Sequence, residues 1–365
     1  MLPATARVTK FLQGTPSVAF REFRPAEGSC RNLTRQILMS PGSTQQRAVE
    51  IASVTHRYGE RTALDAVSFD VRAGEIFGLL GPNGGGKTTL FRLVSTLIPL
   101  QSGAVRILGH DVTSQTHAAR RAMGVVFQAP SLDKKLTVAE NLVHQCHLYG
   151  LAGRMLHERV AEMLARLRLS DRRDDRVETL SGGLRRRVEL AKGMLHEPRV
   201  LVLDEPSTGL DPGARADLWE YLRLIRKEQG VTILLTTHLL EEADKADRLA
   251  ILDRGKLVAL DTPESLRATV GGDTLALESD DPDALAAGIR ERFGYEARRF
   301  DDVVRIEQPE GHRLVAQLVE AFPGRIQSVM LGKPTLEDVF IARTGHRFLG
   351  EERAPTETKK RRHAG

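Results

Sequence analysis

The chain has 365 residues, enough for about two domains, and its 41% hydrophobic content is sufficient for ordinary globular cores. The formal net charge of +5 comes from basic and acidic residues that are interleaved, so composition alone does not indicate a nucleic-acid-binding protein. No apolar run approaches the ~18 residues that a transmembrane helix needs. If the protein works at a membrane, another chain must cross it.

The two ends of the chain differ from the rest. Residues 1–44 contain scattered arginines, prolines and glycines with no sustained apolar periodicity, and they lack the apolar core of a secretory signal. We expect a disordered extension there rather than an organelle transit peptide; alternatively, Met39 is the true start of translation. Residues 346–365, which include "KKRRHAG", are expected to form a basic disordered tail, with a contact to anionic lipid as the alternative.

From residue 49 onward, strands alternate with helices. The expected strands are 49–58, 66–71, 75–81, 104–109, 124–128, 200–205 and 231–238. Helices are expected from Lys87, in three segments between 138 and 195, and over 213–229. The fully apolar strands "VLVLDE" and "VTILLTTH" suit the centre of a parallel sheet. This alternation predicts an α/β domain with buried parallel strands and an all-helical insertion.

A second pattern begins after "VGGD" at 270–273. It reads as a strand (274–278), a helix (282–293), two strands across 297–307, a helix (313–322), a strand (325–331) and a short closing helix from Leu336. The order strand-helix-strand-strand-helix-strand is the split βαβ arrangement. We therefore predict a small α+β domain over 271–345.

A glycine-rich loop lies between an expected strand and an expected helix. Within "GLLGPNGGGKTTL", the spacing Gly81-x-x-x-x-Gly86-Lys87-Thr88 is that of a P-loop, in the context the motif requires. Consecutive backbone N–H groups and a helix N-terminus favour an anion, Lys87 can reach the outer phosphates, and the Thr88 hydroxyl can ligate Mg²⁺. The predicted cradle consists of Gly81, Pro82, Asn83, Gly84, Gly85, Gly86, Lys87, Thr88 and Thr89.

Two acidic residues end the apolar strand "VLVLDE". Open α/β sheets bind ligands at the carboxyl ends of their strands, which is where Asp204 and Glu205 fall. We expect Asp204 to hold Mg²⁺, usually through water, and Glu205 to polarise an attacking water. Adjacent acids alone are weak evidence, but together with a P-loop they become specific.

The stretch "LSGGL" at 180–184, between these two motifs, resembles the signature motif of the ATP-binding subunits of ABC transporters. The resemblance covers about 49–267. In that family two cassettes pair head to tail, and the signature of one closes over the ATP of the other. The resemblance implies that Ser181, Gly182 and Gly183 present a hydroxyl and bare N–H groups to the γ-phosphate on a partner chain, which is compatible with Ser181 also being a helix N-cap.

Four further residues match the family in the correct order. The resemblance implies that Tyr58 stacks on adenine and that Gln128 touches Mg²⁺ and the attacking water. It likewise implies that Asp211 lies in the loop that crosses the dimer interface, and that His238 contacts the γ-phosphate.

Some features depart from the family pattern or lie outside its core. Leu184 stands where glutamine is commonest, and the arginines at 185–187 are expected to form a solvated face. "PTLEDVFIARTG" at 334–345 resembles the closing motif of exporter ATPases of the daunorubicin-resistance type, which work with a separate membrane permease.

Together these features predict a P-loop NTPase of the ABC ATPase type over 45–270. Its core would combine a parallel sheet, an antiparallel β subdomain and a helical subdomain at about 129–196, with the small α+β domain following. The implied function is an ATP- and Mg²⁺-dependent ATPase that energises an exporter of drugs, lipids, polysaccharides or similar cargo. The implied setting is a homodimer or paired cassette, held at the cytoplasmic face of the cell membrane by a permease that contacts 129–151, with no nucleic acid expected.

Two other classes of nucleotide-binding protein fit the sequence less well. A soluble ABC ATPase acting on a ribosome or DNA complex normally carries two cassettes or a long coiled-coil insertion, and neither is present. A GTPase would carry an "NKxD"-type motif that reads guanine, and that motif is absent.

Overall fold

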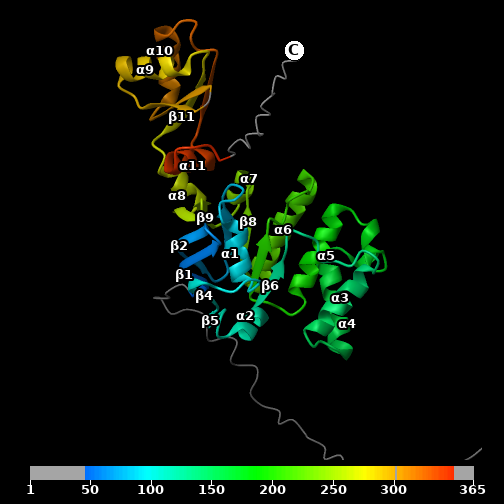
Figure 1. Ribbon diagram of the computed structural model, residues 1–365. Helices are drawn as coiled ribbons and strands as arrows, with labels where there is room; N and C mark the ends of the chain where they lie inside the picture. Colours follow the sequence, from blue (N-terminus) through cyan, green and yellow to red (C-terminus); the bar gives the residue numbers. More distant parts are fainter. Residues whose placement is uncertain (1–45, 301, 349–365) are drawn as a thin grey trace, which may run out of the picture. The chain divides into compact units, whose positions relative to one another are not determined.

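The structure is a computed structural model that describes residues 46–300 and 302–348. The predictions of a disordered extension, of a start at Met39 and of a disordered basic tail therefore fall outside the described residues, apart from 346–348 at the beginning of the tail. The described part contains three separate β-sheets with helices between and around them (Figure 1).

The central sheet has six strands in the order β10-β9-β3-β8-β7-β6. Its strands are β3 (Ile76–Leu80), β6 (Met123–Val126), β7 (Val200–Asp204), β8 (Thr232–Thr237), β9 (Arg248–Asp253) and β10 (Lys256–Asp261). All neighbours are parallel except β9 and β10. Every residue of β3, β7 and β8 is buried, including Asp204 at the end of β7 and the three threonines of β8. Because these strands are parallel, their carboxyl ends meet at one edge of the sheet.

A four-stranded antiparallel sheet has the order β2-β1-β4-β5. It contains β1 (Arg47–Tyr58), β2 (Arg61–Arg72), β4 (Ser102–Ile107) and β5 (His110–Asp111). Its apolar residues share a core with α1 (Lys87–Val94) and with alternate residues of the central sheet such as Phe77 and Leu79. The short helix α2 (Thr116–Ala122) follows β5 and was not expected from the sequence.

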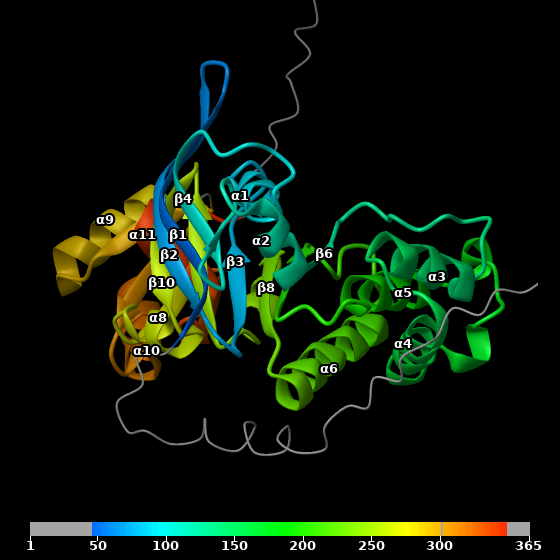
Figure 2. The same cartoon turned by 90° about the horizontal axis from the view of Figure 1, so that it is seen from below.

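The chain between β6 and β7 is helical. It contains α3 (Val138–Leu148), α4 (Gly153–Arg166) and α5 (Gly182–Met194), with 3₁₀ turns at Ser170–Arg172 and Val177–Thr179. Thr137 and Glu140 form a capping box at the start of α3. The three helices share a core with α6 (Pro212–Gln229) and group beside it in Figure 2. The predicted helical insertion is present.

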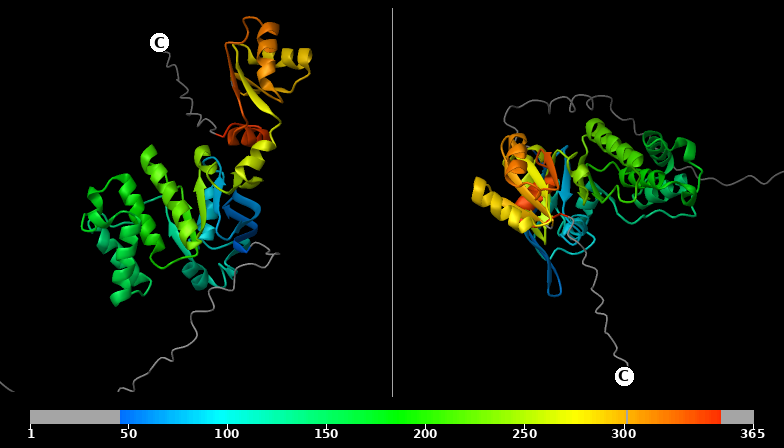
Figure 3. Two further views of the ribbon diagram at one scale, coloured as in Figure 1. Left: turned by 180° about the vertical axis from the view of Figure 1, so that it is seen from behind. Right: turned by 90° about the horizontal axis from the view of Figure 1, so that it is seen from above.

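The third sheet is antiparallel, in the order β12-β13-β11-β14. After α7 (Leu240–Ala243) and α8 (Pro263–Ala268) come β11 (Asp273–Glu278), α9 (Pro282–Phe293), β12 (Ala297–Phe300), β13 (Val303–Gln308), α10 (Gly311–Ala321) and β14 (Ser328–Gly332). The strands joined by α9 are separated by β13, which is the split βαβ arrangement expected. The elements from β11 to β14 have a core of their own, which includes Leu275, Ile289 and Leu318, and they are coloured yellow to orange in Figure 3.

The closing helix, α11 (Leu336–Thr344), begins with a second capping box, formed by Thr335 and Asp338. Its buried side chains, among them Val339 and Phe340, share a core with residues of β3, β9 and α8 rather than with the third sheet. The chain therefore returns to the central sheet after β14.

Candidate functional site

The predicted P-loop connects β3 to α1, and backbone from two other strands packs against it. Gly86 forms the N-cap of α1 with φ 108°, a conformation that favours glycine. A Cβ at Gly81 would lie 2.4 Å from the carbonyl oxygen of Leu252, and one at Gly86 would lie 2.8 Å from that of Ala63. The loop can therefore keep this path only with glycine at both positions.

Lys87 is buried at the start of α1, inside the loop that precedes it. Its ammonium donates hydrogen bonds to the carbonyl oxygens of Gly81 (2.7 Å) and Pro82 (3.0 Å) and lies 3.7 Å from Glu205 Oε1. Burial lowers the pKa of Lys87, and the negative charge of Glu205 opposes that shift. The Lys87 ammonium is thus held between the P-loop and Glu205, which follows β7.

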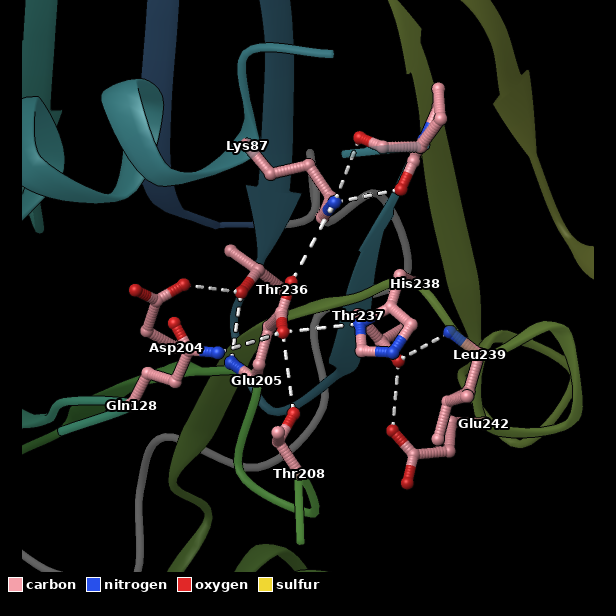
Figure 4. Close-up of polar contacts among 12 residues, drawn as sticks. Lys87, Gln128, Asp204, Glu205, Thr208, Thr236, Thr237, His238, Leu239 and Glu242 are labelled. Carbon is pink, nitrogen blue, oxygen red and sulfur yellow. Dashed lines mark hydrogen bonds and ion pairs between the residues drawn. The ribbon is translucent and has the colours of Figure 1, made fainter. Parts of the chain in front are cut away.

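Glu205 is the centre of a group of polar contacts (Figure 4). Its Oε2 accepts hydrogen bonds from Gln128 Nε2 and Thr208 Oγ1, both at 3.2 Å. His238 Nδ1 lies 3.1 Å from the same oxygen, without the alignment of a hydrogen bond. Glu205 itself has φ 42°, the left-handed region that is uncommon for a residue other than glycine. The ends of β6, β7 and β8 therefore bring Gln128, Glu205 and His238 together.

Thr236, on β8, links Asp204 and Glu205, and it is not among the site residues predicted from the sequence. Its hydroxyl donates to Asp204 Oδ1 (2.6 Å) and accepts from the Glu205 backbone N–H (2.9 Å). Burial raises the pKa of Asp204, and the hydrogen bond from Thr236 acts in the opposite direction. The signal in the sequence was the pair of threonines that ends the buried strand β8, "TILLTT".

A cavity of about 180 Å³ lies beside the P-loop. It is lined by Tyr58, Arg61, Ala63, Pro82, Asn83, Gly84, Gly86, Lys87, Thr88, Thr89 and Glu205. Tyr58 is 46% exposed, at the end of β1, so its ring is available to a ligand. Arg61 is a lining residue that sequence reasoning did not find.

The other predicted residues lie at the starts of α5 and α6 and do not line this cavity. Ser181 Oγ caps α5 by accepting from the Leu184 N–H (3.3 Å), and Asp211 caps α6 by accepting from the Ala214 N–H (2.9 Å). A Cβ at Gly183 would lie only 2.9 Å from the Cβ of Ala214, whereas one at Gly182 would meet nothing closer than 3.9 Å. The close approach of α5 to α6 is therefore an intrachain reason for glycine at 183.

The expectation of a solvated face at 185–187 is wrong for Arg186. This arginine is buried, and it donates from Nε to the Pro206 carbonyl (2.7 Å), from Nη1 to that of Phe127 (2.7 Å) and from Nη2 to that of Asp204 (3.3 Å). Burial lowers its pKa to about 10, so it remains cationic near neutral pH. Its position on α5 faces the loops after β6 and β7, which a linear reading of three arginines could not show.

Known proteins are similar to this chain in both sequence and fold. A family model described as ABC transporter matches residues 64–208. The daunorubicin/doxorubicin resistance ATP-binding protein of Streptomyces peucetius is 38% identical, over 82% of this chain and 93% of that protein. The chain belongs to the ATP-binding proteins of ABC transporters.

Other members extend the comparison. The Nod factor export ATP-binding protein I of Ralstonia nicotianae is 38% identical to this ABC protein, over 84% of this chain and 96% of that one. A solved dimeric ATP-binding cassette in a post-hydrolysis state, bound to ADP and phosphate, superposes with a TM-score of 0.53 at 26% identity. That match covers 59% of this chain and 98% of the cassette.

The family confirms the predicted fold class and the predicted activity: the chain is an ABC-type ATPase that binds ATP. Leu184, the departure from the usual signature, packs partly buried against the helical core. Within the described residues, no helix combines the length and apolar character that crossing a bilayer requires.

Proposed function

We propose that the chain binds Mg²⁺-ATP in the cavity beside the P-loop and hydrolyses it to energise an exporter with a separate membrane permease. The observation that carries this proposal is the Glu205 carboxylate, held between the Lys87 ammonium on one side and Gln128, Thr208 and His238 on the other. Export is supported by relatives whose names refer to daunorubicin resistance and to Nod factor export.

Residues that line the cavity or lie next to it would each bind a different part of Mg²⁺-ATP. The Tyr58 ring would stack on adenine, and Lys87 with the backbone N–H groups of 83–89 would bind the phosphates. Thr88, Gln128 and Asp204 offer a hydroxyl, an amide oxygen and a carboxylate, the hard oxygen ligands that Mg²⁺ prefers. When bound, Mg²⁺ would neutralise charge on the phosphate oxygens.

Hydrolysis joins a water oxygen to the γ-phosphorus and breaks the bond to the oxygen that stays with ADP. Glu205 would orient this water and take its proton, because its carboxylate stands at the carboxyl end of the central sheet beside Lys87. Gln128 and His238 would hold the carboxylate; Gln128 would also touch Mg²⁺ and the attacking water, and His238 would contact the γ-phosphate. After cleavage the γ-phosphate is no longer bonded to ADP, so the two products would each be held by their own contacts.

We further propose a head-to-tail homodimer in which each ATP is shared by two chains. Ser181, Gly182, Gly183 and Asp211 lie outside the cavity of their own chain, which is expected if they complete the site of a partner. A related cassette has been solved as a dimer with ADP and phosphate. In such a pair the signature at the start of α5 would close over the partner's γ-phosphate.

For the permease contact we propose residues 129–151, with the protein held peripherally at the cytoplasmic face of the cell membrane. Leu148, at the end of α3, is 81% exposed, and Met155, at the start of α4, is 59% exposed, so this part of the helical segment presents apolar surface. We also propose a cassette over 45–270, with its helical subdomain at about 129–196, and an accessory domain over 271–345. Separate sheets before and after residue 270 support that division as far as β14, whereas α11 shares a core with β3, β9 and α8 of the cassette.

The proposed chemistry is tested with Glu205→Gln in the full chain. General-base catalysis contributes about 10²–10⁴-fold, so phosphate release should fall by that factor while ATP binding persists and ATP-bound dimer accumulates. Glu228→Gln, on an exposed part of α6, is the matched control. Lys87→Ala should instead lose nucleotide affinity, measured by titration calorimetry. Turnover of Glu205→Gln near that of the wild type would remove Glu205 from the mechanism.

A further inference from the structure

Three side chains of α5, spaced three residues apart, face the loops that carry Gln128 and Glu205. Arg186 reaches the carbonyls of Phe127, Asp204 and Pro206. Glu189, also buried, accepts from the Ser131 N–H (2.5 Å) and from Ser131 Oγ (2.7 Å). Residues three apart on a helix share a face, so one side of α5 binds both loops.

The third side chain completes the attachment. Lys192 donates to the carbonyl oxygen of Ser131 (2.8 Å) and to its hydroxyl (2.9 Å). The segment that contains Gln128 is therefore held at both ends: Phe127 by Arg186, and Ser131 by Glu189 and Lys192. The side chain of Gln128, between these ends, is left to bond Glu205.

The carbonyls that Arg186 binds are placed around the reacting groups. Those of Asp204 and Pro206 lie on either side of Glu205, and that of Phe127 immediately precedes Gln128. Glu205 has φ 42°, a conformation that costs free energy and persists only where the surroundings hold it. A guanidinium suits this task, because its N–H groups point in fixed directions within one plane.

From this geometry we infer that Arg186 is a positioning residue for ATP hydrolysis, acting through Glu205 and Gln128. The inference rests on the proposed function in one respect, namely that these two side chains act on the attacking water. Arg186 also lies on the helix whose N-terminus carries Ser181. In the proposed dimer, α5 would therefore connect the nucleotide of the partner chain with the catalytic loops of its own chain.

A role in packing alone does not account for this arrangement. Burying a charge is costly unless it is hydrogen-bonded, and an apolar side chain would fill the same volume without that cost. All three guanidinium nitrogens of Arg186 instead bind backbone next to catalytic side chains.

The first test is Arg186→Lys, which keeps the charge but cannot bridge three carbonyls with one nitrogen. Misplacing reacting groups by about 1 Å can cost about 100-fold in rate, so we expect kcat to fall between about 10- and 100-fold. The KM for ATP and the affinity for nucleotide should stay within about twofold, because the P-loop is untouched. Arg185→Lys, the neighbouring and partly exposed residue, is the matched control.

The readout that separates positioning from packing is the double variant Arg186→Lys/Glu205→Gln. If Arg186 acts through Glu205, the double variant should turn over no more slowly than Glu205→Gln alone. An equal slowing by Arg186→Lys in both backgrounds would overturn the inference, as would a wild-type kcat for Arg186→Lys. Neither of these results contradicts the proposed function. That function is contradicted only if the wild type releases no phosphate, or if Glu205→Gln is as active as the wild type.

If Arg186→Lys does not fold, Ser131→Ala provides the second test of positioning by α5. Ser131 is exposed, and the change removes only the hydroxyl that bonds Glu189 and Lys192. We expect a several-fold lower kcat at an unchanged KM, and no further loss in a Gln128→Ala background. Unchanged kcat for Ser131→Ala would overturn the inference, because it would show that holding the Gln128 loop against α5 does not affect the rate.

Discussion

At the scale of single residues, the site depends on side chains that hold others in place. Thr236 is the clearest case, because one hydroxyl donates to Asp204 and accepts from the backbone of Glu205. Asp204 is buried, and burial works against its ionised form. In the proposed Mg²⁺ site Asp204 would have to be ionised to act as a ligand, and the hydrogen bond from Thr236 favours that form.

Thr236→Val should therefore weaken Mg²⁺ binding more than ATP binding. Without the donated hydrogen bond the pKa of Asp204 rises further, so the carboxylate is protonated at a higher pH as the solution is acidified. We expect a higher Mg²⁺ concentration for half-maximal ATPase activity and an acidic limb of the pH profile that moves to higher pH. Thr236→Ser, which keeps the hydroxyl, is the control. An unmoved acidic limb in Thr236→Val would contradict this role.

At the scale of secondary-structure elements, the contact between α5 and α6 places the signature residues. Gly183 is where the two helices come closest, next to Ala214. The N-caps Ser181 and Asp211 begin these two helices. The contact therefore sets the position of both predicted interface segments at once.

Gly183→Ala should destabilise the protein because the added Cβ would lie 2.9 Å from that of Ala214. Overpacking of this kind costs about 1–3 kcal/mol, seen as a lower midpoint in thermal or urea denaturation. Gly182→Ala, where the nearest atom is 3.9 Å away, should cost little, and Gly183→Ala/Ala214→Gly should recover stability. Equal midpoints for Gly182→Ala and Gly183→Ala would show that this crossing has room to relax.

At the scale of the whole molecule, the predicted residues fall into two groups within one chain. Tyr58, Lys87 and Glu205 line the cavity, whereas Ser181 and Asp211 do not. The proposed symmetric pair of chains would unite the two groups twice, once at each nucleotide.

This arrangement predicts complementation between inactive chains. When Lys87→Ala and Ser181→Arg chains are mixed, one site of each heterodimer carries both changes and the other carries neither. Half of randomly formed dimers are heterodimers with one intact site, so roughly a quarter of wild-type ATPase activity should return if that site turns over alone. Mixtures of each variant with wild type are the controls. If these retain activity while the two variants together stay inactive, the shared-site model is wrong.

Features formed by contiguous residues could be predicted from the sequence. The P-loop, the pair Asp204 and Glu205, and "LSGG" are short segments whose chemistry is readable from residue types and spacing. The order of elements after residue 270 was also readable, because caps and apolar periodicity are local signals. The strands β9 and β10 were missed, since short apolar runs such as "RLAILD" do not distinguish a strand from a buried helical turn.

Contacts between side chains of distant segments could not be predicted, because they depend on how the whole domain packs. Arg186 stands between two arginines, and nothing in that run shows that it reaches Phe127 and Pro206 while its neighbours do not. Whether an arginine lies in water or in a buried hydrogen-bond network depends on the loops that pack over it. Those loops come from β6 and β7, on either side of the helical insertion, so their positions follow from the packing of the whole domain and not from the residues around position 186.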